Sequence, residues 1–255
     1  MSTSAAKSSA LAPVTRPRTY VVTGSGSPLG QRTTRRLSAT GARVITVDTV
    51  EADVVAELRA PSGRSAMVRG VAAFTGGVVD GVVVTAVLDV AERELDRAAE
   101  AGVEGLYFAP VAAIAGLRPL LAGSGAPRAV AVTGSPTHPL PDDALVEACL
   151  SGDEGHAIEL ADRLFADGRG GVVASSAATA LQVWLGRHAR TREWAGRGIP
   201  LVGVESGQIA RADDESEEDL AAFVTELAIA RVLPVTGTLL EPHAVPTRTG
   251  GRMPA

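Results

Sequence analysis

The sequence predicts a single doubly wound α/β domain built on a parallel β-sheet. Short, fully apolar segments alternate with longer segments of helical periodicity along most of the chain. Strands that are apolar on both faces are typical of parallel sheets covered by helices on both sides. A glycine-rich turn follows the first of these segments, where such folds often bind a nucleotide. No second core and no internal repeat is evident, so we expect residues 18–242 to form one domain.

The expected strands are runs of β-branched and aliphatic residues bounded by turn signals. They cover residues 19–23, 42–48, 80–85, 129–133, 199–204 and 237–240. The expected helices carry apolar residues at helical spacing. They cover residues 29–40, 92–101, 111–121, 176–195 and 216–232. Residues 1–17, rich in Ser, Ala, Thr and Pro, are expected to form a disordered tail, and residues 243–255 a C-terminal tail.

Residues 139–171 make a long connection between an expected strand and an expected helix. Pro141 marks one helix start, and Ser151 and Asp153 precede an apolar-periodic run that ends at Gly168. We therefore expect a helical insertion over the edge of the sheet, in a place that suits a binding or interface surface.

Composition narrows the possible partners. The net charge is −5, without the basic stripe that nucleic-acid binding requires. The longest apolar runs are too short to span a membrane. Cys149 is the only cysteine, and the histidines lack metal-pair spacing, so we expect neither a disulfide nor a metal site. The N-terminus has no apolar signal segment, and the expected location is the cytoplasm.

Residues 23–30, Thr-Gly-Ser-Gly-Ser-Pro-Leu-Gly, join the first expected strand to the first expected helix. Such a loop lets the backbone approach a pyrophosphate and directs helix N–H groups toward it. The second expected strand ends in Asp48, where a carboxylate suits the ribose hydroxyls of NAD. The pattern predicts an NAD site. The alternative is a tight turn that binds no nucleotide.

These segments resemble the short-chain dehydrogenase/reductase family, and are most similar to its hydroxysteroid dehydrogenase/carbonyl reductase branch, which has a helical insertion before the catalytic helix. The resemblance covers residues 20–240 and implies a Rossmann-type domain with a shortened substrate lid. It assigns cofactor contacts to the loop, the strand-end acid, an acid–apolar pair and the end of the third expected strand. These are Gly24, Ser25, Gly26, Leu29, Gly30, Asp48, Glu57, Leu58, Thr85 and Ala86.

Two residues depart from the family's cofactor pattern. Pro28 replaces the middle glycine of the loop. Proline suits a first helical position but removes one N–H donor. Val87 places a branched side chain where a glycine would let the ribose pass. We therefore expect NAD binding to be weakened, or lost altogether.

The family's catalytic residues are a tyrosine that donates a proton, a lysine four residues later, a serine and an asparagine. The resemblance places Ala174 at the tyrosine, Ala178 at the lysine, Gly134 at the serine and Leu106 at the asparagine. None of these replacements carries a titratable proton. General acid–base groups supply rate factors of about 10² to 10⁴, so we expect the family's Ser-Tyr-Lys chemistry to be absent.

No shift of the alignment restores this motif. The only lysine is Lys7, in the N-terminal tail, and the only tyrosines are Tyr20 and Tyr107. The threonine that holds the nicotinamide in the family is replaced here by Ile209. The proton donor, its lysine and the nicotinamide anchor are therefore missing together.

Three functional hypotheses follow. The leading one is a catalytically silent family member that acts through association, as a non-catalytic subunit or an NAD-sensing regulator of a partner reductase. The resemblance implies homo- or hetero-oligomers with a partner of the same fold, assembled through residues 111–121, residues 176–195 and the last strand. The second is a repurposed non-redox or cofactor-independent enzyme of bacterial secondary metabolism that uses Ser135, His138 or Glu205. The third is an NAD-dependent oxidoreductase with a non-standard proton donor.

Overall fold

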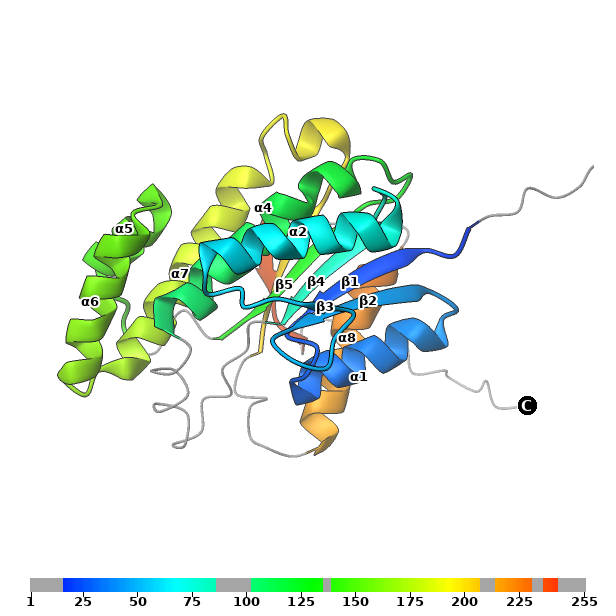
Figure 1. Ribbon diagram of the computed structural model, residues 1–255. Helices are drawn as coiled ribbons and strands as arrows, with labels where there is room; N and C mark the ends of the chain where they lie inside the picture. Colours follow the sequence, from blue (N-terminus) through cyan, green and yellow to red (C-terminus); the bar gives the residue numbers. More distant parts are fainter. Residues whose placement is uncertain (1–15, 86–101, 135–138, 207–213, 231–235, 243–255) are drawn as a thin grey trace, which may run out of the picture.

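Seven parallel strands form one sheet in the order β3-β2-β1-β4-β5-β6-β7 (Figure 1). The computed structural model describes residues 16–85, 102–134, 139–206, 214–230 and 236–242. The strands are β1 (Thr19–Thr23), β2 (Arg43–Asp48), β3 (Val54–Val55), β4 (Gly81–Thr85), β5 (Ala129–Thr133), β6 (Leu201–Glu205) and β7 (Thr238–Leu240). The predicted doubly wound α/β fold is confirmed. Because every strand runs in the same direction, their carboxyl ends meet at one edge of the sheet.

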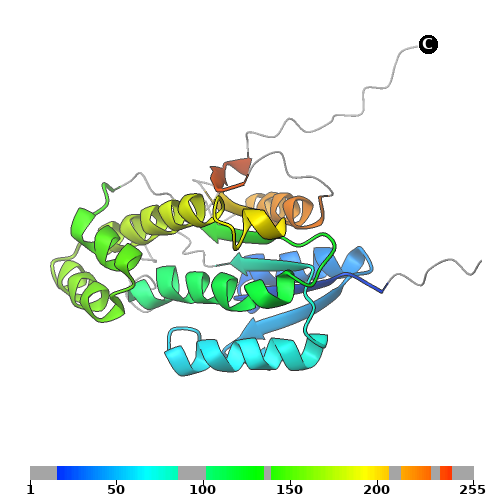
Figure 2. The ribbon, with the colours of Figure 1, turned by 90° about the horizontal axis from the view of Figure 1, so that it is seen from above.

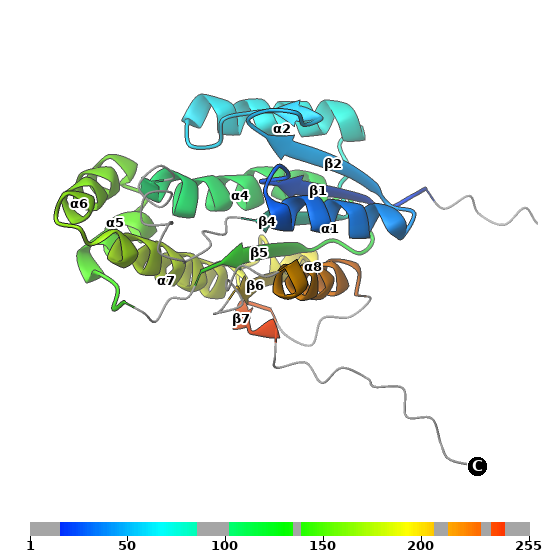
Figure 3. The ribbon, with the colours of Figure 1, turned by 90° about the horizontal axis from the view of Figure 1, so that it is seen from below.

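Helices cover both faces of the sheet (Figures 2 and 3). One face carries α1 (Pro28–Ala39) and α8 (Asp214–Ile229), which pack against each other. The other carries α2 (Pro61–Thr75), α4 (Ala109–Leu121) and α7 (Gly170–His188). A π-helical turn, η1 (Glu104–Phe108), leads into α4, and a 3₁₀ turn, η2 (Ala195–Arg197), follows α7. Among the described residues, no helix is long and apolar enough to cross a membrane.

The strands alternate their side chains between two apolar cores. In β1, Val21 faces the core beneath α2, α4 and α7, whereas Tyr20 and Val22 face the core beneath α1 and α8. Successive residues of a strand point to opposite faces, so a strand buried on both sides must be apolar throughout. Burying one aliphatic side chain stabilises the fold by about 1.5–3 kcal/mol. The two cores therefore fix the sheet that positions the site.

The predicted helical insertion is formed by α5 (Asp143–Ser151) and α6 (Glu154–Ala166). The Asp142 and Asp153 side chains cap these helices by accepting hydrogen bonds from Leu145 N and His156 N, both at 3.1 Å. Both helices pack against α7 and project beyond the carboxyl edge of the sheet (Figure 1). Their contact is apolar and joins the core beneath α2, α4 and α7.

One expected helix differs in position from the structure, and two elements of the structure were not expected. The helix predicted over residues 176–195 is wrong in position, because α7 spans Gly170–His188. Burial of its first turn outweighs the low helix propensity of the two glycines that begin it. Both α2 and the short β3 were not predicted. The helix predicted over residues 92–101 lies outside the described residues.

Candidate functional site

The turn between β1 and α1 is a close backbone contact that depends on glycine. Gly24 has φ +69°, in the left-handed region that favours glycine. A Cβ at Gly24 would lie 2.7 Å from Thr85 Oγ1 and 2.8 Å from the Thr85 carbonyl oxygen. The Thr85 hydroxyl donates to the Thr23 carbonyl at 2.7 Å, which ties the end of β4 to the turn. The first strand, the turn and β4 thus form one rigid unit at the carboxyl edge.

Pro28 occupies the first position of α1, which begins one residue before the predicted helix over residues 29–40. Ser27 caps this helix, because its hydroxyl accepts from Gly30 N at 3.0 Å and donates to the Gly24 carbonyl at 2.7 Å. The amides of Gly24 and Ser25 both donate to the Val47 carbonyl, at 3.0 and 3.4 Å. A pyrophosphate at this loop would therefore compete with internal acceptors for several of the amides.

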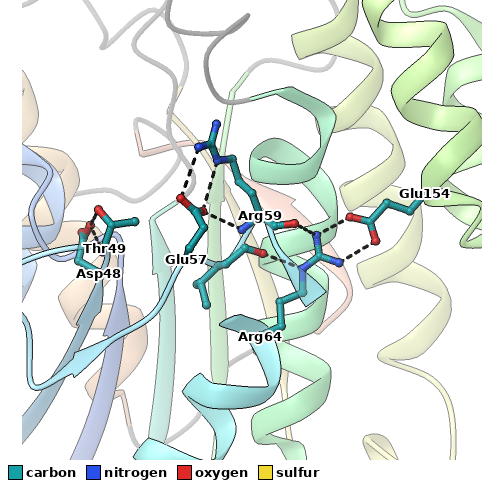
Figure 4. Close-up of polar contacts among 7 residues, drawn as sticks. Asp48, Thr49, Glu57, Arg59, Arg64 and Glu154 are labelled. Atoms are coloured by element: carbon teal, nitrogen blue, oxygen red, sulfur yellow. Dashed lines mark hydrogen bonds and ion pairs between the residues drawn. The ribbon is translucent and has the colours of Figure 1, made fainter. Parts of the chain in front are cut away.

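Asp48 lies at the end of β2, beside the loop (Figure 4). Its Oδ2 accepts a hydrogen bond from Gly26 N at 2.8 Å. Its Oδ1 accepts from Thr49 N at 2.7 Å and from the Thr49 hydroxyl at 3.2 Å. Each carboxylate oxygen has further acceptor capacity. The side chain is thus held in one orientation and still suits the hydroxyls of a ribose.

The segment after β3 carries the acid–apolar pair. Glu57 accepts from the backbone N of Arg59 at 3.0 Å and from its guanidinium at 3.3 and 3.4 Å (Figure 4). Hydrogen bonds from the Arg59 backbone and side chain lower the pKa of Glu57 below its ordinary value, against the opposing effect of burial. Leu58 is half-buried and packs against the core beneath α2. Glu57 therefore already has a cationic partner within the chain.

The positions that the resemblance assigns to the catalytic residues are aliphatic. Ala174 and Ala178 lie one helical turn apart on α7, so they share one face of it. Leu106 lies in η1, which packs against α7, and Ala174 borders the same core cluster. Gly134 directly follows β5, and a Cβ there would touch no atom of the described residues within 4 Å. These positions offer methyl groups and an open glycine.

Both tyrosines are buried in the two cores. Tyr20 is 1% exposed and faces the core beneath α1 and α8. Tyr107 is 2% exposed in the opposite core, with its ring edge-on to Phe108 at 5.0 Å between centroids. Burial raises the pKa of both phenols above the ordinary value. Neither phenol is therefore exposed at a surface that a substrate can reach.

Of the three residues suggested for a repurposed active site, only Glu205 lies within the described residues. Glu205 ends β6, is half-buried and lies in register with Thr133 of β5. The neighbouring Ser206 hydroxyl, which the sequence did not single out, is buried without a hydrogen-bond partner in the described part of the chain. The other candidates and three cofactor-side positions lie outside the described residues: Ser135, His138, Ala86, Val87 and Ile209. In the described ranges, no group of three or more acidic, His or Cys side chains is placed to hold a metal ion.

Ser176 joins the insertion to α7, between the two alanines described above. Its hydroxyl accepts from Asp142 N at 2.8 Å and donates to the Val172 carbonyl at 2.6 Å. Ser176 is fully buried. The sequence alone gave no signal for this contact, because it depends on where the insertion packs.

No protein-family model and no curated protein matches this sequence. Among solved structures, the 3-alpha-hydroxysteroid dehydrogenase from Pseudomonas sp. B-0831, complexed with NADH, is 30% identical. The match covers 88% of this chain and 93% of that one, with a TM-score of 0.74. The chain belongs to the short-chain dehydrogenase/reductase family.

Two more distant structures share the family fold. Menthone neomenthol reductase from Mentha piperita is 17% identical over 89% of this chain and 99% of that one, with a TM-score of 0.66. A short-chain dehydrogenase/reductase from Brucella ovis, in complex with a partially ordered NAD, is 16% identical. That match covers 89% of this chain and 99% of the other, with a TM-score of 0.61. These two similarities support the fold assignment and nothing further.

The Ser176 contact predicts that two adjacent serines of this short-chain dehydrogenase/reductase contribute differently to its stability. Ser176→Ala leaves the Asp142 amide without its acceptor and should lower the free energy of unfolding by about 1–3 kcal/mol. Ser175→Ala is the matched control, because within the described ranges that hydroxyl donates to the Val172 carbonyl of its own helix, at 3.1 Å, and not to the insertion. Its effect should be about 0.5 kcal/mol or less. Urea denaturation followed by circular dichroism measures both. Equal effects would show that Ser176 does not hold the insertion.

Proposed function

We propose that this chain is a catalytically silent short-chain dehydrogenase/reductase that keeps an adenosine-binding site for NAD and works through association with a partner of the same fold. The main support is that the positions which the family resemblance assigns to catalysis carry aliphatic side chains or none. Ala174, Ala178, Leu106 and Gly134 carry no titratable group. The proposal therefore separates nucleotide binding from hydride transfer.

Reduction of a ketone by NADH requires a proton for the oxygen that becomes the alcohol. A catalytic phenol does this best when its pKa is lowered toward the working pH. Burial instead raises the pKa of the Tyr20 and Tyr107 phenols above the ordinary value. This supports the absence of the family's acid–base chemistry, which supplies a rate factor of about 10² to 10⁴.

Retention of NAD is supported by the loop and by Asp48. The glycine-dependent turn at Gly24 packs against Thr85 and holds the loop in a fixed shape at the start of α1, where helix N–H groups favour an anion such as a pyrophosphate. Asp48 is oriented at the strand end that suits a ribose. Pro28 and the internally bonded amides favour a weaker phosphate contact than a loop with a third glycine would give.

Calorimetric titration with NAD tests the cofactor part. We expect micromolar affinity, which corresponds to about −8 kcal/mol. Asp48→Ala removes the ribose acceptor and should weaken binding by about 10- to 100-fold, because a hydrogen bond to a charged group contributes about 1.5–3 kcal/mol. Glu51→Gln is the control, since this exposed carboxylate lies three residues further on. Equal affinity in Asp48→Ala and the unmodified chain would refute this placement of the ribose.

Light scattering on the purified chain, alone and mixed with a reductase from the same genome that retains the Tyr-x-x-x-Lys motif, tests association. In this chain α5 and α6 already pack against part of α7, which leaves α4, the rest of α7 and the edge strand β7 for a partner. We expect a mass above that of one chain, either alone or in the mixture. The mass of a single chain in both samples would contradict association.

A further inference from the structure

The Arg64 guanidinium joins two parts of the chain that are far apart in sequence. Arg64 lies in the first turn of α2. Its Nε and Nη2 donate to the carbonyl oxygens of Leu58 and Arg59, both at 2.7 Å. Its Nη1 and Nη2 also donate to the two carboxylate oxygens of Glu154, at 2.8 and 2.6 Å (Figure 4). Glu154 is the first residue of α6, in the insertion.

This junction is largely shielded from water. The Arg64 and Glu154 side chains are 12% and 26% exposed. The guanidinium carbon also lies 5.9 Å from the centre of the Phe108 ring in η1. Solvent and salt screen partly buried charges less than exposed ones. The two-point carboxylate contact additionally fixes the direction of both side chains.

The geometry requires arginine. The planar guanidinium directs donors toward the carboxylate and toward two backbone carbonyls at once. A lysine ammonium is a compact point charge and does not offer that fixed fork. The contact to Glu154 therefore also determines where the donors of Arg64 hold the backbone of residues 58 and 59.

Glu57 and Leu58 are the acid–apolar pair that the family resemblance places against the adenine. Arg64 binds the carbonyl oxygens of Leu58 and of Arg59, which directly follows the pair. We propose that Arg64 is a positioning residue for the adenosine site, and that Glu154 makes the shape of this site depend on the seating of the insertion. This inference rests on the NAD binding proposed above. A loop held in its binding shape needs little further ordering when the ligand arrives, and this raises affinity.

The coupling is reciprocal by thermodynamic necessity. If seating of α6 strengthens nucleotide binding, the nucleotide must strengthen the seating of α6 by the same factor. The insertion is the part of the fold that projects beyond the sheet (Figure 1). A partner that contacts α5 or α6 would thus sense whether the adenosine site is filled.

The decisive variant is Glu154→Gln, which keeps the side-chain size but removes the charge. Glu159→Gln, an exposed position on the same helix, is the matched control. Calorimetry with AMP and with NAD should show both affinities falling about tenfold in Glu154→Gln, because AMP carries the adenosine half alone, and a tenfold change corresponds to about 1.4 kcal/mol. Amide hydrogen exchange across residues 56–60, without nucleotide, should become several-fold faster in Glu154→Gln and stay unchanged in Glu159→Gln.

A double-mutant cycle separates positioning from a general loss of stability. In an Arg64→Met background, Glu154→Gln should have no further effect on AMP affinity, because Arg64 transmits the effect. An equal effect of Glu154→Gln in both backgrounds would overturn the inference. So would unchanged AMP affinity or unchanged exchange in Glu154→Gln alone.

The same experiment distinguishes this inference from the proposed function. No binding of AMP or NAD by the unmodified chain would refute the proposed NAD site, and the positioning role with it. Binding by the unmodified chain that is equally strong in Glu154→Gln would refute only the coupling through Arg64.

Discussion

The parallel direction of all seven strands is the constraint on which the site depends. It brings the ends of β1, β2, β4, β5 and β6 to one edge, so the loops that follow them share one surface. Two apolar cores, one on each face, hold this arrangement in place. The stability of the sheet does not depend on which side chains its loops carry. A chain can therefore keep this framework while the side chains at the edge change, and fold alone does not imply function.

The two halves of this edge differ in chemical character. On the β1–β2 side, backbone amides, a glycine turn and the Asp48 carboxylate form an oriented polar surface. On the side of α7 and η1, the family resemblance assigns the catalytic positions to Ala174, Ala178 and Leu106. Binding requires only the polar half, whereas hydride transfer to a ketone also requires a proton donor. The proposed function follows from that division.

Strand positions were predictable because apolar runs on both faces leave few alternatives. Residues 19–23 and 129–133 match β1 and β5 to the residue. The helix α2 was missed because it begins Pro-Ser-Gly and fully buries only Met67 and Val71. Within the site, the loop and Asp48 could be placed from their order along the chain. The Arg64–Glu154 contact could not, because its partners are 90 residues apart and meet only once the insertion packs against α7.

Transfer of deuterium from NADH would show whether this chain can carry out hydride transfer. The purified chain is incubated with NADH carrying deuterium at either face of nicotinamide C4, together with a ketone such as a 3-ketosteroid. Mass spectrometry then measures deuterium in the alcohol. We expect no more labelled alcohol than in a protein-free sample, even with the chain in excess of the ketone. Labelled alcohol formed over many turnovers of the isolated chain would show that the protein is not catalytically silent.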